Sequence, residues 1–407
     1  NPQVAPTLSR RQKKNRTRRD DGSPGTVKKR EAARQQREKT SSLISMQLSQ
    51  LNMVEQDLAS FLHNYTLSWE QLVQLGFPVE FGLYPGRAMF YKASEAPHFG
   101  PSRPYTRFDV NAREFVPKEN YFYVSYLLKD NEDFKNKDNV IKKESEEVAK
   151  ERKCVRCSKG FFVTTSGNYL SEDQCTYHWG KLHSNKYVSE SYTCCNGQPD
   201  SPGCSNGPVH VWNGIHDGMN GPLEGFVRTR PRKSPPPNGN TGVYALDCEM
   251  CYTKNGLELS RVTVVASDGR LVYDTIVRPE AKIIDYNSRF SGITAKDYIV
   301  KSSKTLKDVQ NDLMGFIHAD TILIGHGLDN DLRALKMIHS TCVDTSVIFP
   351  HHFGLPYRRS LKSLANLFLK TAIQTDTQGH DSSEDARTCI GLMLYRIERD
   401  FRAVCSL

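Results

Sequence analysis

The sequence contains no apolar run that approaches the residues, about 18, needed to cross a bilayer, so we expect no membrane partner. Nothing at its beginning resembles a secretory signal, although the first residue is Asn1 and the chain can be a fragment of a longer protein. Most of the chain also has no excess of positive or negative charge. Residues 1–40 hold 13 Lys/Arg and 4 Asp/Glu, which equals the whole formal excess of +9, so the remaining residues are neutral overall.

Residues 1–40 have almost no apolar content, and we predict that they form a disordered basic tail. Clusters such as RRQKKNRTRR favour a nuclear localisation signal and a non-specific nucleic-acid-binding arm. A solubilising tail is the alternative. On this basis we expect the protein in the nucleus, with a cytoplasmic location as the alternative.

Disulfide bonds have no support in the sequence, because nothing indicates an oxidising compartment. Eleven cysteines are present, and six of them stand between Cys154 and Cys204 in the patterns CVRC, CTYH, YTCC and GC, followed by VHVW. Six thiolates and two imidazoles match two tetrahedral zinc ions, whose ligand pairing the sequence leaves open. The candidate zinc ligands are Cys154, Cys157, Cys175, His178, Cys194, Cys195, Cys204 and His210. We expect about two structural zinc ions that fold a small domain for RNA handling or protein docking.

Composition divides the chain into six segments, and the Pro/Gly-rich stretch RTRPRKSPPPNGNTG is the clearest boundary. The segments are a disordered basic tail (1–40), an N-terminal helical and irregular region (41–128), a charged linker (129–153), the Cys/His zinc-binding module (154–227), a Pro/Gly linker (228–242) and a C-terminal domain (243–407). In the second segment, apolar residues at helical spacing predict one amphipathic helix over residues 43–62. Ser68 and Gln71 predict a capped short helix that ends at Gly76 and Pro78.

Regular patterns begin after Gly242. Strands are expected at Val243–Met250, Leu259–Ala266 and Leu271–Val277, with SDG as a hairpin turn before the third. Helices and strands then alternate: a helix near 305–318, a buried strand at TILIGHG, a helix over LDNDLRALKMI, a strand near Val343, a helix through SLKSLANLFL and a last helix over 383–400. Meander strands followed by this alternation indicate a three-layer α/β sandwich with a mixed sheet.

Two carboxylates stand inside an otherwise buried strand, YALDCEMCYT. Because strand side chains alternate between faces, Asp247 and Glu249 point to the same face, where two negative charges repel and are costly to desolvate. Asp331, in the helix after ILIGHG, and Asp385, at the start of the last helix, belong to elements that converge on the same edge of the sheet. Four carboxylates suit two Mg²⁺ or Mn²⁺ ions, which prefer oxygen ligands, and His380 can take a proton from a bound water.

The segments ALDCEM, LIGHGLDNDLRAL and HDSSEDA resemble the three motifs of the DEDD superfamily of 3′–5′ exonucleases, and the His before the last Asp is typical of the DEDDh subgroup. The longer run LDCEMCYT…LELSRVTVV…DTIVRP…DYNSRFSGIT, continued by DTSVIFPH…RRSLKSLANLFL…IQ, resembles the Rex-type RNA exonucleases of eukaryotes. The resemblance covers about residues 242–400 and implies a ribonuclease H-like fold. It also implies metal ligands at Asp247, Glu249, Asp331 and Asp385, a general base at His380, and contact of Met250 with the terminal nucleotide.

Two further acids compete for a role. Asp329 is a rival of Asp331, and the register of the family motif favours Asp331. Asp344 is interpreted as a supporting or structural acid and left out of the catalytic set. The upstream segment CTYH…YTCC…GC…H resembles the cysteine-and-histidine-rich (CHORD) zinc modules.

The resemblance implies a 3′–5′ exoribonuclease that releases nucleoside 5′-monophosphates from free 3′ ends of RNA, with two metal ions and a histidine base. Two alternatives remain open at this point. One is a non-catalytic scaffold for RNA or protein with a vestigial nuclease fold, which an incomplete acidic set would favour. The other is a 3′–5′ exonuclease that acts on DNA.

Overall fold

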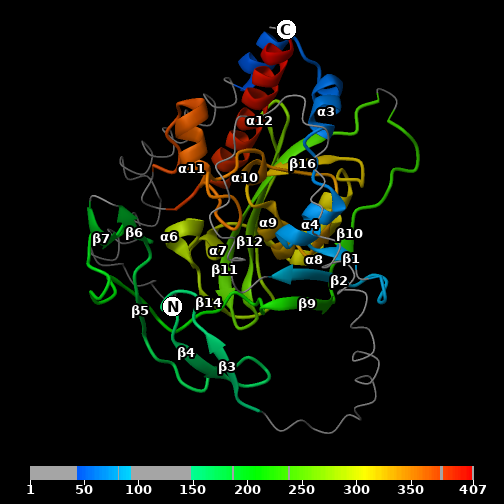
Figure 1. Ribbon diagram of the computed structural model, residues 1–407. Coiled ribbons are helices and arrows are strands. Elements are labelled where there is room, and N and C mark those ends of the chain that lie inside the picture. Colours follow the sequence, from blue (N-terminus) through cyan, green and yellow to red (C-terminus); the bar gives the residue numbers. More distant parts are fainter. Residues whose placement is uncertain are drawn as a thin grey trace, which may run out of the picture.

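A seven-stranded mixed sheet forms the centre of the protein in a computed structural model, which describes residues 44–80, 82–92, 148–185, 188–236, 239–375 and 379–405 (Figure 1). The order across the sheet is β15, β13, β12, β11, β16 and β18, and β14 pairs with the far end of β11. The strands are β11 (Val243–Thr253), β12 (Gly256–Ala266), β13 (Leu271–Val277), β14 (Ile283–Asp285), β15 (Ser303–Lys304), β16 (Ile322–Gly325) and β18 (Cys342–Asp344). Strand β11 runs antiparallel to β12 and parallel to β16, which confirms the predicted mixed sheet.

Helices cover both faces of this sheet, as expected for the three-layer sandwich (Figure 1). On one face lie a helix over residues 44–51, α3 (Glu55–His63), α10 (Thr345–Ile348), α11 (Leu361–Leu364), the π-helical turn η1 (Ala365–Leu369) and α12 (Ser382–Cys405). On the other lie α4 (Trp69–Leu75), α8 (Leu306–Met314) and α9 (Leu328–Ala334). Val243 and Ala245 of β11 face the first set, whereas Leu246 and Cys248 face the second. This alternation fixes which face of β11 receives Asp247 and Glu249.

The N-terminal region is part of this sandwich. Ile44 and Leu58 lie in the core beneath α12, and Leu72 lies in the core on the opposite face. The single helix predicted over 43–62 is wrong, because the chain breaks at Asn52, which adopts a left-handed φ of 50°. The break lets the two short helices pack separately on one face of the sheet. The predicted cap of α4 is confirmed: Ser68 accepts from the N–H of Gln71, and the helix ends at a left-handed glycine.

A second predicted helix is shorter in the structure than expected. The helix expected over LDNDLRALKMI ends at Ala334, and Met337–Ile338 instead form β17, which pairs in parallel with β10 (Val227–Arg228). Lys336 has a φ of 47°, which stops the helix, and the two apolar residues of β17 are buried. The segment expected as a Pro/Gly linker is also held to the domain, since the Arg232 guanidinium binds Asp320 at 3.1 Å.

The Cys/His module consists of three two-stranded ladders around a very small apolar core (Figure 1). They pair β3 (Lys150–Lys153) with β4 (Gly160–Val163), β5 (Cys175–Tyr177) with β8 (Ser205–Gly207), and β6 (Leu182–Asn185) with β7 (Val188–Tyr192). The chain then forms β9 (Gly218–Leu223), which joins β1 (Val79–Glu80) and β2 (Ala88–Lys92) in a separate sheet. A core of this size needs another source of stability, for which metal ions are the usual device.

Two short helices, α6 (Ser288–Ser291) and α7 (Asp297–Val300), lie between β14 and β15. No helix within the described ranges combines the length and the apolar character needed to cross a membrane. The predictions for residues 1–40, and for the part of the charged linker before residue 148, lie outside the described residues.

Candidate active site and metal centres

Asp247 and Glu249 lie on the face of β11 that α12 covers, in line with Val243 and Ala245. In the ladder with β12, Asp247 is opposite Thr263 and Glu249 is opposite Arg261. The register shifts between Glu249 and Met250, so the strand has a β-bulge directly after the second acid. Bulges of this kind re-aim side chains and are common beside active sites.

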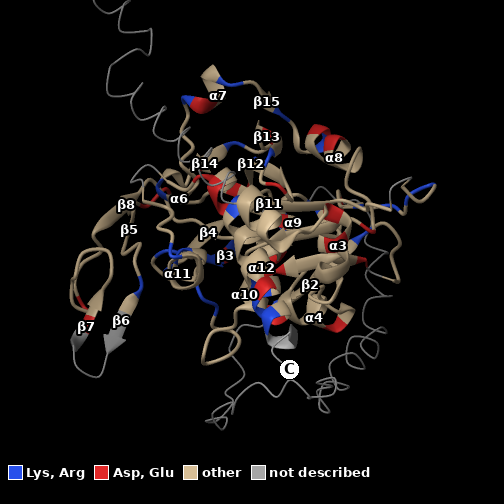
Figure 2. Ribbon diagram, turned by 90° about the horizontal axis from the view of Figure 1, so that it is seen from above, with Lys and Arg blue, Asp and Glu red and all other residues tan. Residues whose placement is uncertain are grey.

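Two further elements bring the other predicted acids to this place. Asp331 lies in α9, and its carboxylate accepts a hydrogen bond of 2.8 Å from the N–H of Cys248, the residue between the strand acids. Asp385 lies in the first turn of α12, the helix that packs against β11 and β12. Figure 2 shows acidic residues beside β11 in the interior of the fold. The structure thus brings together four acids from three separate elements.

These carboxylates are close enough to shift one another's pKa. Burial raises the pKa of Asp247 well above its usual range, and the charges of Asp385, Asp331 and Glu249 raise it further. Burial and the charge of Asp385 raise the pKa of Glu249 in the same way, while the Arg261 guanidinium lowers it. Burial also raises the pKa of Asp385 to about 7. Without a bound cation, the protein therefore disfavours ionisation of all four carboxyl groups, and added positive charge would favour their ionised forms.

The chemistry of these side chains fits hard divalent cations. All four offer carboxylate oxygens, which Mg²⁺ and Mn²⁺ prefer. Glu249 is 6% exposed, and its Oε1 is buried without a hydrogen-bond partner, as expected of an oxygen reserved for another ligand. Among the described residues, only the Cys/His groups below have all ligand atoms within 4.8 Å of one another, so the carboxylates are more widely spaced.

His380 approaches the acids from the loop before α12. Its Nδ1 lies 3.8 Å from Oδ2 of Asp385. The backbone N–H of His380 donates to the backbone carbonyl of Phe290 in α6 at 2.7 Å. The neighbouring Gly379 packs tightly on Gly292, since a Cβ at Gly379 would lie 2.2 Å from the Gly292 nitrogen. Burial lowers the pKa of His380, which favours the neutral imidazole that can accept a proton.

The two competing acids have other partners. Both oxygens of Asp329 are bound by guanidinium groups, from Arg333 at 2.9 Å and Arg358 at 2.8 Å, so its charge is already compensated. Asp344 accepts hydrogen bonds from the N–H groups of Gly327, Leu328 and Ser346. It therefore holds the start of α9 and α10 in place, which agrees with a structural role for this acid.

Two residues beside the acidic site, Gln374 and Arg261, were not predicted from the sequence. Gln374 donates from Nε2 to both oxygens of Asp385, at 3.1 and 3.0 Å, and its own backbone adopts a left-handed φ of 53°. Its only signal was its place in the Rex-like stretch, since a loop glutamine carries no periodic pattern. Arg261 lies opposite Glu249 and binds both oxygens of Asp274 at 2.7 Å. Met250, expected at the terminal nucleotide, is partly buried against the core on the α9 side.

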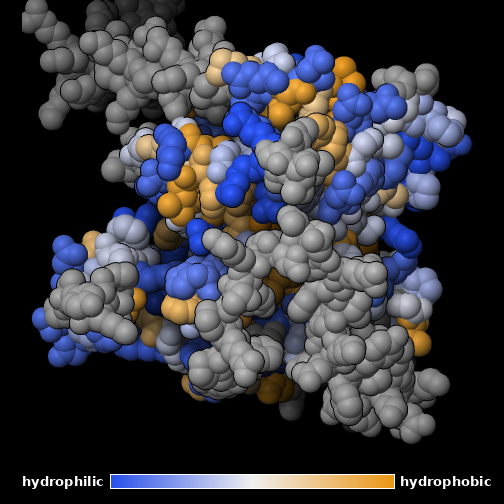
Figure 3. All heavy atoms as spheres, turned by 45° about the horizontal axis from the view of Figure 1, so that its top comes forward, coloured by the Kyte–Doolittle hydropathy of each residue, from blue (hydrophilic) through white to orange (hydrophobic). Residues whose placement is uncertain are grey.

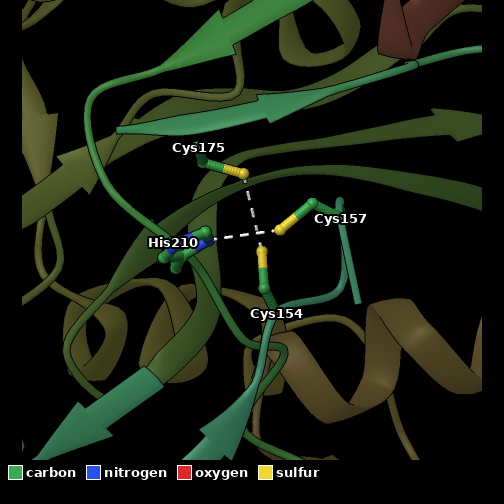
Figure 4. A group of neighbouring side chains, drawn as sticks. All are labelled: Cys154, Cys157, Cys175 and His210. Carbon is green, nitrogen blue, oxygen red and sulfur yellow. Dashed lines mark hydrogen bonds between the residues drawn. The ribbon is translucent and has the colours of Figure 1, made fainter. Parts of the chain in front are cut away.

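The structure assigns the predicted zinc ligands to two groups of four. The first is Cys154, Cys157, Cys175 and His210, whose side chains point toward one another (Figure 4). The sulfurs of Cys154 and Cys175 are 3.7 Å apart, and Nδ1 of His210 is 3.2 Å from the sulfur of Cys157. Burial opposes ionisation of Cys154, but hydrogen bonds from the N–H groups around it lower its pKa to about 6, which favours a thiolate.

The second group is His178, Cys194, Cys195 and Cys204. The sulfur of Cys194 lies 3.5 Å from that of Cys204 and 3.8 Å from that of Cys195. Nε2 of His178 is 3.1 Å from the carbonyl of Ser201, which leaves Nδ1 directed at the cysteines. In a tetrahedral zinc site with bonds of about 2.3 Å, neighbouring sulfurs lie about 3.8 Å apart, so both groups fit zinc. The ten cysteines whose side chains the structure describes are all free, as the metal interpretation requires.

Sequence comparisons find two known families in this chain. The family described as exonuclease matches residues 244–393, and the family described as RNA exonuclease 3 middle domain matches residues 152–207. The first match contains the four acids and His380, and the second contains seven of the eight Cys/His ligands, all except His210.

Several curated proteins are similar over these regions. The chain is 47% identical over 251 residues to Exonuclease GOR of Pan troglodytes, 48% identical over 254 residues to RNA exonuclease 1 homolog of Homo sapiens and 39% identical over 254 residues to RNA exonuclease 3 of Schizosaccharomyces pombe. The alignments cover 61%, 61% and 60% of this chain, but 36%, 20% and 44% of these relatives. The chain therefore matches less than half of the length of each of them.

Proposed function

We propose that this chain is a 3′–5′ exoribonuclease of the Rex type, because residues 244–393 match the exonuclease family and residues 152–207 match the RNA exonuclease 3 middle domain. It would remove nucleoside 5′-monophosphates one at a time from a free 3′ end. The observation that carries the proposal is that Glu249, Asp331 and Asp385 are buried, that their charges raise the pKa of the half-buried Asp247, and that His380 lies beside Asp385. A scaffold with a vestigial nuclease fold would have no reason to keep all five groups together.

Asp247, Glu249, Asp331 and Asp385 would hold two Mg²⁺ or Mn²⁺ ions in the proposed site. When bound, these cations would hold the scissile phosphate and make a water acidic enough to lose its proton near neutral pH. His380, whose neutral form burial favours, would accept that proton. Gln374 would orient Asp385 through its two hydrogen bonds, and Cys248 would orient Asp331 through its N–H. Met250 remains a proposed contact for the terminal nucleotide.

RNA is the proposed substrate because the relatives named above include RNA exonucleases 1 and 3. DNA with a free 3′ end is the alternative. The test is to incubate the purified chain with Mn²⁺ and 5′-labelled RNA and DNA oligonucleotides of the same sequence. We expect a ladder of shortened RNA with an intact 5′ label, and much slower loss of DNA. Shortening from the 5′ end, or equal rates on both polymers, would contradict the proposal.

We further propose that each Cys/His group holds one zinc ion with a structural role, because four ligands per ion leave no open position for a substrate. The module would then serve RNA handling or protein docking. Metal analysis of the purified chain should give about two zinc ions per molecule. A folded chain without zinc would rule this part out.

A nuclear location is proposed from the basic tail alone. A fluorescent fusion of the whole chain should accumulate in the nucleus, and removal of residues 1–40 should redistribute it. An unchanged distribution would show that the tail is a solubilising segment, as in the alternative interpretation.

A further inference from the structure

An exposed cluster of aromatic rings lies between α10 and α11. His351, His352, Phe353 and Tyr357 pack on one another, with ring centroids 3.9 to 5.8 Å apart. Phe353 is 68% exposed and Tyr357 58% exposed, and Leu355 between them is 53% exposed. Figure 3 shows that apolar side chains do reach the surface of the molecule among hydrophilic ones. Exposed apolar clusters of this kind mark interaction sites.

The backbone presents these rings in one fixed arrangement. The N–H of Gly354 donates to the carbonyl of His351 at 2.8 Å, and the N–H of Tyr357 donates to the carbonyl of Gly354 at 3.0 Å. Phe349, just before this turn, is 6% exposed and anchors the segment in the core. The backbone turn that carries the rings is therefore formed before any partner binds, which lowers the entropy cost of binding.

Positive charge surrounds this cluster. Arg358 and Arg333 share the carboxylate of Asp329, and the charge of Asp344 also acts on the Arg358 guanidinium. Within the described part of the chain Arg359 forms no ion pair, and Lys362 donates to the carbonyl of Gln374 at 3.0 Å. Exposed rings bordered by basic groups are the composition of surfaces that bind single-stranded nucleic acid.

The cluster is also connected to the acidic site. The Arg358 guanidinium lies beside Gly327, at the start of α9, the helix that carries Asp331. Lys362 binds the carbonyl of Gln374, and Gln374 in turn binds Asp385. Arg358, which follows Tyr357 in the chain, and Lys362 of α11 therefore contact the elements that position Asp331 and Asp385.

We propose that His351, His352, Phe353 and Tyr357 form a stacking platform for the bases of single-stranded RNA upstream of the 3′-terminal nucleotide. This inference rests on the proposed function and specifies how the substrate strand is held there. Stacking is tolerant of sequence because every base has an aromatic face, so the platform would bind different RNA sequences. A docking site for a protein is the competing occupant, and the basic border and the connection to the acids favour RNA.

The test compares RNA lengths in an Asp247→Asn background, so that binding is measured without hydrolysis. Fluorescence anisotropy would follow 5′-labelled oligoadenylates of 2 and 10 nucleotides with Mn²⁺ present. Loss of stacking on one base costs about 1–3 kcal/mol, so Phe353→Ala with Tyr357→Ala should weaken the 10-mer at least about tenfold. The dinucleotide should bind as before, because it does not extend beyond the terminal site.

The conservative variant Tyr357→Phe should keep the affinity of the 10-mer, since it retains the ring. Trp69→Ala is the matched control, because Trp69 is an aromatic residue of similar exposure, 51%, on α4 and should not change binding. Unchanged affinity of the double variant for the 10-mer would overturn the platform and leave a protein as its occupant. Equal losses for both lengths would also overturn it, because they would indicate damage to the terminal site. Neither readout requires hydrolysis, so a failure of the proposed activity remains distinguishable.

Discussion

The guanidinium of Arg156 lies 2.5 Å from the carboxylate of Asp285, and this ion pair joins the Cys/His module to the exonuclease domain. Both side chains are nearly buried, 10% and 17% exposed. Arg156 stands between two ligands of the first Cys/His group, and Asp285 accepts the N–H of Asn287, which starts α6. Because the carbonyl of Phe290 in α6 binds the N–H of His380, the module is connected to the proposed base.

Removal of this ion pair should loosen the loop that carries His380. Arg156→Met leaves Asp285 buried and unpaired, which costs about 3–5 kcal/mol for a fully buried pair and less at this exposure. We expect faster amide hydrogen exchange across residues 286–292 and 379–381, and a kcat several-fold lower with little change in KM.

Arg152→Met is the matched control for this change. Arg152 belongs to the same module, but it stacks on Trp212 at 3.9 Å and does not contact α6. Zinc content should be the same in both variants. Equal exchange rates at His380 in the wild type and in Arg156→Met would contradict the connection.

Replacement of either strand acid should abolish hydrolysis without unfolding the chain. Asp247→Asn and Glu249→Gln keep the side-chain volume and remove one negative charge from a repulsive cluster, so thermal stability without metal should stay equal or rise. Turnover should fall by at least about a hundredfold because divalent ions lose a ligand. Thermal unfolding and oligonucleotide hydrolysis test the two halves separately. Near-normal turnover in either variant would show that the acid is not a metal ligand.

The metal-free protein should have a characteristic pH dependence. The pKa of Asp385 is about 7 in the folded chain against an ordinary value of 3.8. Between these values the folded state binds more protons than the unfolded state, so this group lowers the free energy of unfolding as pH rises from about 4 to 7. Asp385→Asn should remove that loss, and the Tm difference between variant and wild type in EDTA should grow with pH.

Mn²⁺ should stabilise the wild-type protein more strongly as the pH rises, whereas the metal-free protein loses stability. Since protons compete with the cation for Asp385, the increase in Tm on adding Mn²⁺ should be larger at pH 8 than at pH 5. Scanning calorimetry with and without Mn²⁺ measures both effects. A Tm increase that is independent of pH would exclude Asp385 from the metal site.

Gln374 offers a test of orientation as distinct from ligation. Gln374→Ala removes both hydrogen bonds to Asp385 and leaves the four carboxylates in place. We expect kcat to fall about ten- to a hundredfold with weaker Mn²⁺ binding, as is typical for loss of a group that orients a ligand. Gln374→Glu adds a charge to the acidic cluster and should be worse. Metal titrations that match the wild type would show that Gln374 has no orienting role.

Much of the fold was predictable because it depends on local periodicity. Strands β11, β12 and β13 and the last helix follow from alternation and 3.6-residue spacing, and they appear where the pattern placed them. The helix over 43–62 and the end of α9 were not predictable in the same way. Their breaks at Asn52 and Lys336 depend on how the flanking segments pack on the sheet, which spacing does not encode.

The candidate site was likewise predictable only in part from the sequence. The sequence by itself determined which residues are candidate metal ligands, because the types and spacing of Asp247, Glu249 and the cysteines favour metal binding. Only the tertiary structure decided that Cys154 shares a ligand group with His210 and that Gln374 supports Asp385. These partners are far apart in the chain or lie in irregular loops. Their contacts therefore arise from the packing of whole elements, and no short-range pattern records them.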